Sequence, residues 1–190
     1  MTAQIGDIYK YNNKECRLVA RDSSNLFNPK AFGMEPHAMS TACWRGYFCE
    51  YAIIDDELFL EKLCLFNADG KYPLLNGIKA VKPKFKYAGY YEYRNINMPI
   101  SYTGKMLVGN EFIREYYIHM GLQKPWAYQE LLELVFEDGI LLECNDYSYI
   151  AKKIRQLIDD EKRMWHIPFE EIKKIFDDKG LEYYDDSLLF

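Results

Sequence analysis

The stretch TACWRGYFCEYAIIDDELFLEKLCLF, residues 41–66, predicts one long β-hairpin. A three-residue turn at 55–57 would pair Ile54 with Leu58, and the same register sets Glu50 opposite Lys62. This pairing places opposite charges together. The register also gives the pairs Ala52–Leu60 and Phe48–Cys64.

Apolar side chains occupy both faces of this hairpin. One face carries Trp44, Phe48, Ala52, Leu60, Cys64 and Phe66. The reverse face carries Tyr47, Cys49, Tyr51, Ile53, Phe59, Leu63 and Leu65. A sheet with one solvated face alternates more cleanly between apolar and polar residues, so we expect other parts of the chain to cover each face.

Length and composition favour a single folded domain over residues 1–190. A chain of this size buries roughly 70% of its unfolded surface, which is enough for a core without disulfides. Apolar residues make up 49% of the sequence and aromatic residues 16%, with 17 Tyr and 11 Phe. Aromatic residues are common in strands, so the composition favours a sheet over a helical bundle.

Turn signals divide the first part of the chain into strands. Residues 5–11 and 16–22 flank two asparagines and form a predicted hairpin. Residues 23–40 form a long loop that is rich in Ser, Asn and Pro, and the loop is a candidate lid over the sheet. Further strands are expected at 78–81, 85–94 and 100–108.

The second part of the chain combines one hairpin with helices. Asn110 is a candidate cap for a helix over 111–120. Strands at 127–136 and 140–144 flank an Asp-Gly turn, and apolar stripes predict helices from about 146 to 165 and over 169–179.

These elements predict an α+β fold. The expected architecture is a multistranded, mainly antiparallel meander sheet with a mid-chain helix and two C-terminal helices packed on one face. Residues 1–145 would be mainly strands, with the helix near 111–120, and residues 146–180 would form a helical C-terminal element of the same domain.

Charge and cysteine usage point to a cytoplasmic protein. The net charge is -5, which repels nucleic acid and anionic membrane surfaces. The cysteines are odd in number and unclustered, as is typical of reduced thiols in a cytosol. The first residues contain neither a basic nor an apolar targeting segment, and no apolar run is long enough to span a membrane.

The sequence lacks recognisable catalytic motifs. It contains no G-x-S-x-G nucleophile turn and no glycine-rich phosphate loop. The histidines at 37, 119 and 166 have no metal-ligand spacing beside them. We therefore expect no catalytic residue, no metal and no cofactor.

Two groups of residues are candidates for contact with a protein partner. Trp44, Arg45 and Tyr47 belong to the residue types that dominate binding energy at interfaces, although Arg45 is also explained by its stem lying across Tyr47. Acidic residues near the C-terminus would steer a basic partner, or would simply form a solvated face. They are Asp177, Asp178, Glu182, Asp185 and Asp186.

The sequence is also compatible with two alternative functions. The first is a small-ligand-binding protein or enzyme with a pocket between loop 23–40 and the sheet, in which His37, Tyr87 and Tyr91 supply polar groups. The second is a homodimeric structural protein that buries one sheet face against its own copy.

The sequence describes a small, acidic, tyrosine-rich α+β chain that contains the hairpin TACWRGYFCEYAI, followed by SYTGKMLVG and ELVFEDGIL. In these features the chain resembles the immunity proteins of bacterial polymorphic and contact-dependent toxin systems. The resemblance implies a noncatalytic cytoplasmic protein that binds a cognate toxin domain and masks its active site. Immunity proteins differ in their contact surfaces, so the resemblance transfers no binding residue to this chain.

Overall fold

The computed structural model describes residues 2–22, 26–38, 40–83, 89–161 and 169–177. The strands are β1 Ile8–Tyr11, β2 Lys14–Arg21, β3 Tyr47–Ile54, β4 Glu57–Leu65, β5 Tyr91–Pro99, β6 Gly104–Phe112, β7 Tyr128–Glu137 and β8 Ile140–Asp146. The helices are α1 Ser148–Glu161 and α2 Phe169–Asp177, and the 3₁₀ turns are η1 Pro29–Phe32, η2 Arg114–Tyr116 and η3 Pro125–Ala127.

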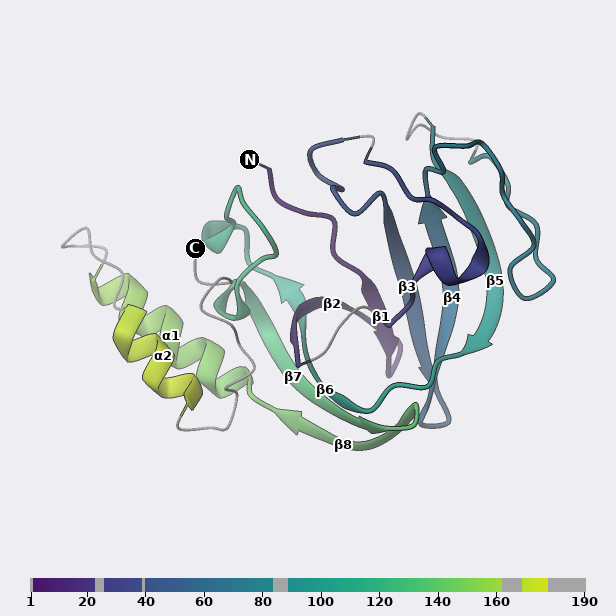
Figure 1. The fold of residues 1–190 in the computed structure, drawn as a ribbon. Coiled ribbons are helices and arrows are strands. Elements are labelled where there is room, and N and C mark those ends of the chain that lie inside the picture. Colours follow the sequence, from purple (N-terminus) through teal and green to yellow (C-terminus); the bar gives the residue numbers. More distant parts are fainter. Residues whose placement is uncertain (1, 23–25, 39, 84–88, 162–168, 178–190) are drawn as a thin grey trace.

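The strands form a closed barrel. Their order is β3-β1-β2-β6-β7-β8-β4-β5, and β3 also pairs with β4, so the seven strands other than β5 complete a ring. β5 extends the sheet beyond β4 (Figure 1). β1 runs parallel to β3, and the other pairings are antiparallel. The predicted open meander is therefore wrong, because β2 pairs with the distant β6 and β1 lies between β2 and β3.

The barrel closes at the joint between β8 and β4, which have the shortest strand pairing in the barrel. Glu57 pairs with Ile140, the Leu58 amide donates to the Gly139 carbonyl at 2.9 Å, and the Leu141 amide donates to the Asp56 carbonyl at 2.7 Å. The Gly139 amide also donates to the Tyr102 carbonyl at 2.8 Å. Gly139 therefore links the β7–β8 turn both to β4 and to the segment that precedes β6.

The β3–β4 hairpin partly follows the predicted register. Its turn contains two residues, Asp55 and Asp56, whose φ values of 50° and 63° are typical of a type I′ turn, so Ile54 pairs with Glu57 and not with Leu58. Ala52 correspondingly pairs with Phe59, which corrects the predicted pairing with Leu60.

A β-bulge then restores the expected register. It lies between Glu50 and Tyr51 and leaves Glu61 without a partner on β3. Beyond the bulge, Glu50 pairs with Lys62, and Phe48 pairs with Cys64. The charge pairing predicted from the sequence is therefore confirmed.

The hairpin faces have different environments. Its inner face belongs to a buried core that contains Tyr9, Tyr47, Tyr51 and Leu63, and the rings of Tyr9 and Tyr51 stack at 5.1 Å. On the outer face, Ala52 and Cys64 are buried, whereas Phe48 is partly buried and Trp44 is 58% exposed. Other parts of the chain therefore cover this face in part.

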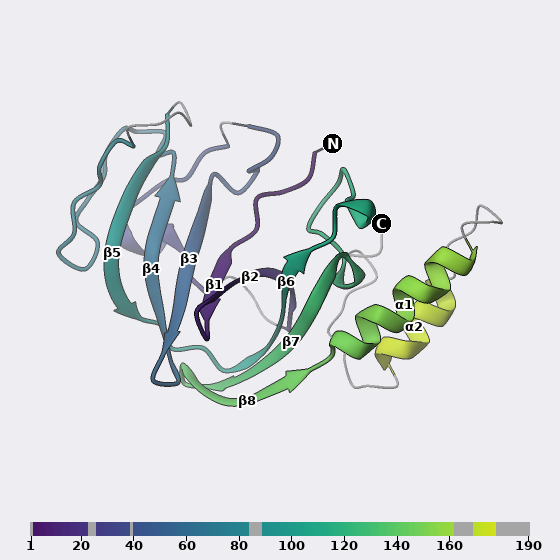
Figure 2. The same cartoon turned by 180° about the vertical axis from the view of Figure 1, so that it is seen from behind.

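A second core lies between the barrel and the helices. α1 lies against the outside of β7, and α2 runs beside α1 (Figures 1 and 2). Leu107 and Leu131 face them from the sheet, and Ile150, Ile154 and Ile172 are buried from the helix side. The apolar stripes of the two helices therefore pack against the outer wall of a barrel.

The predicted helix over 111–120 is absent. β6 continues to Phe112, which pairs with Tyr128 at the start of β7, and only the short turn η2 follows. The Asn110 side chain accepts a hydrogen bond from the amide of Glu111, whose φ is 56°, at 2.7 Å, so Asn110 stabilises the end of a strand and caps no α-helix. Pairing with β7 overrides the helical spacing of the apolar residues in this segment.

Candidate functional site

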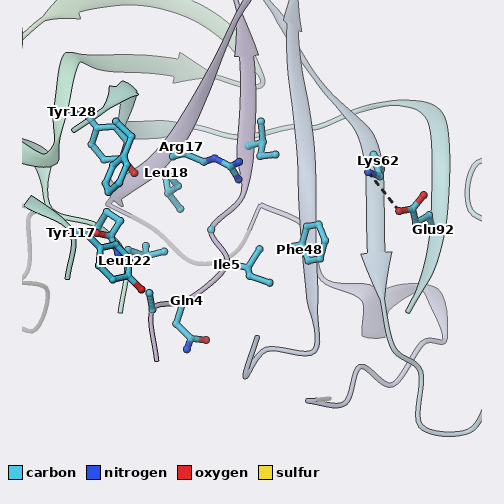
Figure 3. Close-up of a pocket in the computed structure, with 15 residues that line it drawn as sticks. Gln4, Ile5, Arg17, Leu18, Phe48, Lys62, Glu92, Tyr117, Leu122 and Tyr128 are labelled. Carbon is cyan, nitrogen blue, oxygen red and sulfur yellow. Dashed lines mark ion pairs between the residues drawn. The ribbon is translucent and has the colours of Figure 1, made fainter. Parts of the chain in front are cut away.

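An open groove of about 620 Å³ lies on the outside of the barrel. In Figure 3, Tyr117, Leu122 and Tyr128 stand on one side of it and Phe48 on the other. The lining residues are Ala3, Gln4, Ile5, Gly6, Ile8, Arg17, Leu18, Phe48, Lys62, Glu92, Phe112, Tyr117, Leu122, Gln123 and Tyr128. The groove is therefore mainly apolar, with a few polar side chains.

Tyr128 can form one wall because its neighbour on the sheet is a glycine. A Cβ atom at Gly109 would lie 2.4 Å from the Tyr128 ring, so the ring occupies the space that a side chain would fill. Gly109 pairs with Arg17 of β2. Burial raises the pKa of the Tyr128 hydroxyl to about 12, and the nearby Arg17 guanidinium acts in the opposite direction.

Hydrogen bonds hold the segments around the groove in place. The Gln4 side-chain amide donates to the Thr41 carbonyl at 2.8 Å, and its oxygen accepts from the Trp44 amide at 3.2 Å. The Gln123 side chain bonds both the amide and the carbonyl of Ile118, at 3.0 and 2.9 Å. Both glutamine side chains are thus already engaged within the chain, and they fix the shape of the groove.

The charged groups in the groove differ in their pairing. Lys62 contacts Glu92 at 3.8 Å (Figure 3) and Glu50 at 2.9 Å. Glu92 also contacts Arg94 at 2.5 Å. Arg17 is exposed and makes no ion pair with any residue in the described part of the chain. Among the described residues, the Arg17 guanidinium in the groove therefore has no ion-pair partner, in a protein of net charge -5.

Exposed aromatic and apolar side chains border the groove. Phe112 and Tyr117 belong to its lining and are 42% and 45% exposed. Trp44, 58% exposed, lines an adjoining hollow of about 280 Å³ that shares Gln4 and Leu122 with the groove. The rim thus extends the apolar surface beyond the groove itself.

The three residues predicted as hairpin anchors occupy different environments. Trp44 is exposed, whereas Tyr47 is buried and its hydroxyl donates to the Phe27 carbonyl at 3.0 Å. Arg45 forms an ion pair with the buried Asp7, and its guanidinium carbon lies 4.4 Å from the centre of the Tyr47 ring. Arg45 thus lies across Tyr47, as the structural alternative from the sequence predicts. Among the three anchor candidates, Trp44 is the one with an exposed side chain.

The other predicted residues lie away from the groove or outside the described residues. Asp177 is the last residue of α2, and its side chain is not described. Asp178, Glu182, Asp185, Asp186 and Tyr87 lie outside the described residues. His37 is exposed, and Tyr91 stacks on Tyr72 at 4.1 Å. Phe27 and Met34 of the predicted lid are buried in the core.

No family model, curated protein or solved structure matches this chain. Within the described residues, no helix is both long enough and apolar enough to cross a membrane. A search of the same residues finds no group of three or more His, Cys, Asp or Glu side chains placed to hold a metal ion.

The sequence does not predict that Arg17, Phe112, Tyr117 and Tyr128 are neighbours. It predicts a helix that contains Phe112 and Tyr117, and a strand that contains Tyr128. These residues meet because β2 pairs with β6, and β6 pairs with β7. The local signal is Gly109, directly after the strand predicted at 100–108, since an isolated glycine in a strand often marks a close approach by another group.

Lys124 follows the groove residue Gln123, and its buried charge can be tested by substitution. Lys124 is 5% exposed, and burial lowers its pKa to about 8, below the ordinary lysine value of about 10.4. Charged Lys124 therefore destabilises the fold at pH 7, and the penalty decreases as the pH rises from about 8 to about 10. We expect Lys124→Met to raise the free energy of unfolding by about 1 to 3 kcal/mol at pH 7 and by less at pH 10.

Urea unfolding of both proteins at pH 7 and pH 10 measures this difference. Lys153→Met, at an exposed position of α1, is the matched control, and we expect a change within about 0.5 kcal/mol. A loss of stability in Lys124→Met at pH 7 would show that the ammonium group is not a destabilising buried charge.

Proposed function

We propose that this chain is a noncatalytic cytoplasmic binding protein that neutralises a cognate bacterial toxin by covering its active site. The single observation that supports the proposal is the apolar groove with its exposed aromatic rim on the outside of a closed barrel. A contiguous exposed apolar surface with a polar surround is typical of a protein-binding site. Aromatic and arginine side chains dominate the binding energy of such sites.

The rigidity of the groove favours a partner that binds without large rearrangement. The strand bearing Phe48 belongs to the barrel, and Gln4 and Gln123 fix the neighbouring segments through their hydrogen bonds. A preorganised surface loses little conformational entropy on association, which favours tight binding. Tight binding is what the neutralisation of a toxin requires.

The charge of the chain supports a basic partner. A net charge of -5 increases the rate of encounter with a positively charged toxin domain. In this proposal the C-terminal acidic residues named above contribute to steering, whereas the groove and Trp44 supply the contact. Steering predicts an association rate that falls as the salt concentration rises.

The proposal is tested by purifying the chain with the toxin-like product of an adjacent gene and measuring their affinity by calorimetry. We expect a stable complex that Tyr117→Ala and Trp44→Ala each weaken by about tenfold or more, because truncation of an aromatic hot spot removes about 2 kcal/mol or more of binding energy. Leu142→Ala, at a 57% exposed position of β8, is the control and is expected to leave the affinity unchanged.

Two results would contradict the proposed function. One is the absence of a complex with every neighbouring toxin-like protein. The other is a complex that neither aromatic substitution weakens, which would place the contact on another surface.

A further inference from the structure

The position of Arg17 indicates what kind of segment the groove receives. We propose that the partner inserts a large apolar side chain next to a carboxylate, and that Arg17 binds this carboxylate while the groove buries the apolar side chain. This inference rests on the proposed function, since it specifies the chemistry that the binding surface recognises. It does not require the partner to be acidic, because one carboxylate on a basic protein is sufficient.

Arg17 projects into the groove from the outer face of the barrel. It lies on β2, where it pairs with Ile8 of β1 on one side and with Gly109 of β6 on the other. Figure 3 shows it between Phe48 and Tyr128, above Ile5. A carboxylate that reached Arg17 would therefore have an apolar surface on each side.

Lys62, the other cation of the groove lining, does not compete for the carboxylate. Lys62 is already paired with Glu50 and Glu92, and Glu92 is also paired with Arg94. The charges of the lining are Arg17, Lys62 and Glu92, which leave one net positive charge. A ligand with one negative charge neutralises this excess, whereas a cationic ligand adds to it.

The nature of this cation favours a carboxylate over a phosphate group. A guanidinium is planar and binds a carboxylate through two parallel hydrogen bonds. Sites that recognise phosphorylated segments generally use clusters of arginines. The lining of this groove contains a single arginine and is mostly apolar, which suits a monoanion attached to a large apolar group.

A matched pair of small probes tests the inference without the toxin. N-acetyl-phenylalanine and N-acetyl-phenylalaninamide share the apolar side chain and differ in the carboxylate. Titration of each into the isotopically labelled full chain, followed by NMR chemical shifts, gives both affinities and the residues that respond. We expect the acid to bind about tenfold more tightly than the amide and to shift the signals of Arg17, Phe48 and Tyr128, because a charge-assisted hydrogen bond contributes that much affinity.

Arg17→Gln provides the decisive comparison. We expect the variant to bind the acid about tenfold more weakly than the original protein does and to bind the amide with unchanged affinity. Arg114→Gln removes the same charge at an exposed position outside the groove lining and is expected to retain the preference for the acid. An unchanged melting temperature and NMR spectrum confirm that Arg17→Gln is folded.

Several outcomes would overturn the inference. Equal affinity of the original protein for acid and amide would exclude carboxylate recognition, as would an unchanged preference in folded Arg17→Gln. Decanoate binding much more tightly than N-acetyl-phenylalanine would indicate a small-molecule lipid site. Sedimentation of a dimer, with groove signals that shift on dilution, would indicate a second copy as the occupant. Because the probes act without a partner, this test can fail while the toxin complex still forms.

Discussion

Replacing Arg45 by leucine is expected to lower the free energy of unfolding by about 3 kcal/mol, because it leaves a buried carboxylate without its counter-ion. The Asp7 side chain is 1% exposed and accepts hydrogen bonds from the guanidinium of Arg45 and from the Cys49 amide, the latter at 2.8 Å. The Arg45 Nε group also donates to the Tyr47 carbonyl at 3.0 Å. Chemical denaturation at pH 7 measures the loss.

A double variant separates the charge effect from lost packing. Asp7→Asn combined with Arg45→Leu removes both charges, so we expect it to be more stable than Arg45→Leu alone, although it loses the same arginine stem. Arg114→Leu is the exposed control, with an expected change within about 0.5 kcal/mol. If Arg45→Leu were as mild as this control, Arg45 would be available for recognition and its structural explanation would be wrong.

Gly139→Ala is expected to destabilise the protein by about 3 kcal/mol through strain and a steric clash at the barrel joint. Gly139 has a φ of +87°, and a Cβ atom there would lie 2.3 Å from the carbonyl oxygen of Ile100. That oxygen belongs to the backbone and cannot move aside as the end of a side chain can. Thermal and urea unfolding measure the effect.

The matched control for this substitution is Gly77→Ala. Gly77 has a similar φ of +78°, but no atom lies within 4 Å of the Cβ position. We expect the control to lose only about 1 kcal/mol, from the backbone conformation alone. Equal losses in the two variants would show that the Gly139–Ile100 contact does not constrain the β8–β4 joint.

The spacing of apolar residues along the chain could not predict how the groove is built. Residues 112–120 carry apolar positions with helical spacing, yet Phe112 pairs with Tyr128 and the remainder follows an irregular path to the groove wall. The helical pattern does not report which positions become buried, because Phe112, Tyr117 and Met120 are 42%, 45% and 39% exposed. It does not report the partner, which in this case is a strand that begins more than a dozen residues later.

Hairpins were predicted more successfully because their information is local. The Asp-Gly turn at 138–139 and the asparagines at 12–13 each connect two adjacent strands as expected. Within the longest hairpin, the turn length was wrong by one residue, and a bulge compensated for it, so that Glu50 still pairs with Lys62. Opposite charges across two strands thus identified the final register better than the turn did.

By itself, the sequence determined the positions of the hairpins, the aromatic, strand-rich character of the chain and the pairing of Glu50 with Lys62, because each depends on residues that are close in the chain. Only the tertiary structure decided that the sheet closes through β8 and β4, and that Arg17 faces an apolar groove built from distant segments. Long-range strand pairing selects among many registers of similar local quality, and the selection depends on how the whole core packs.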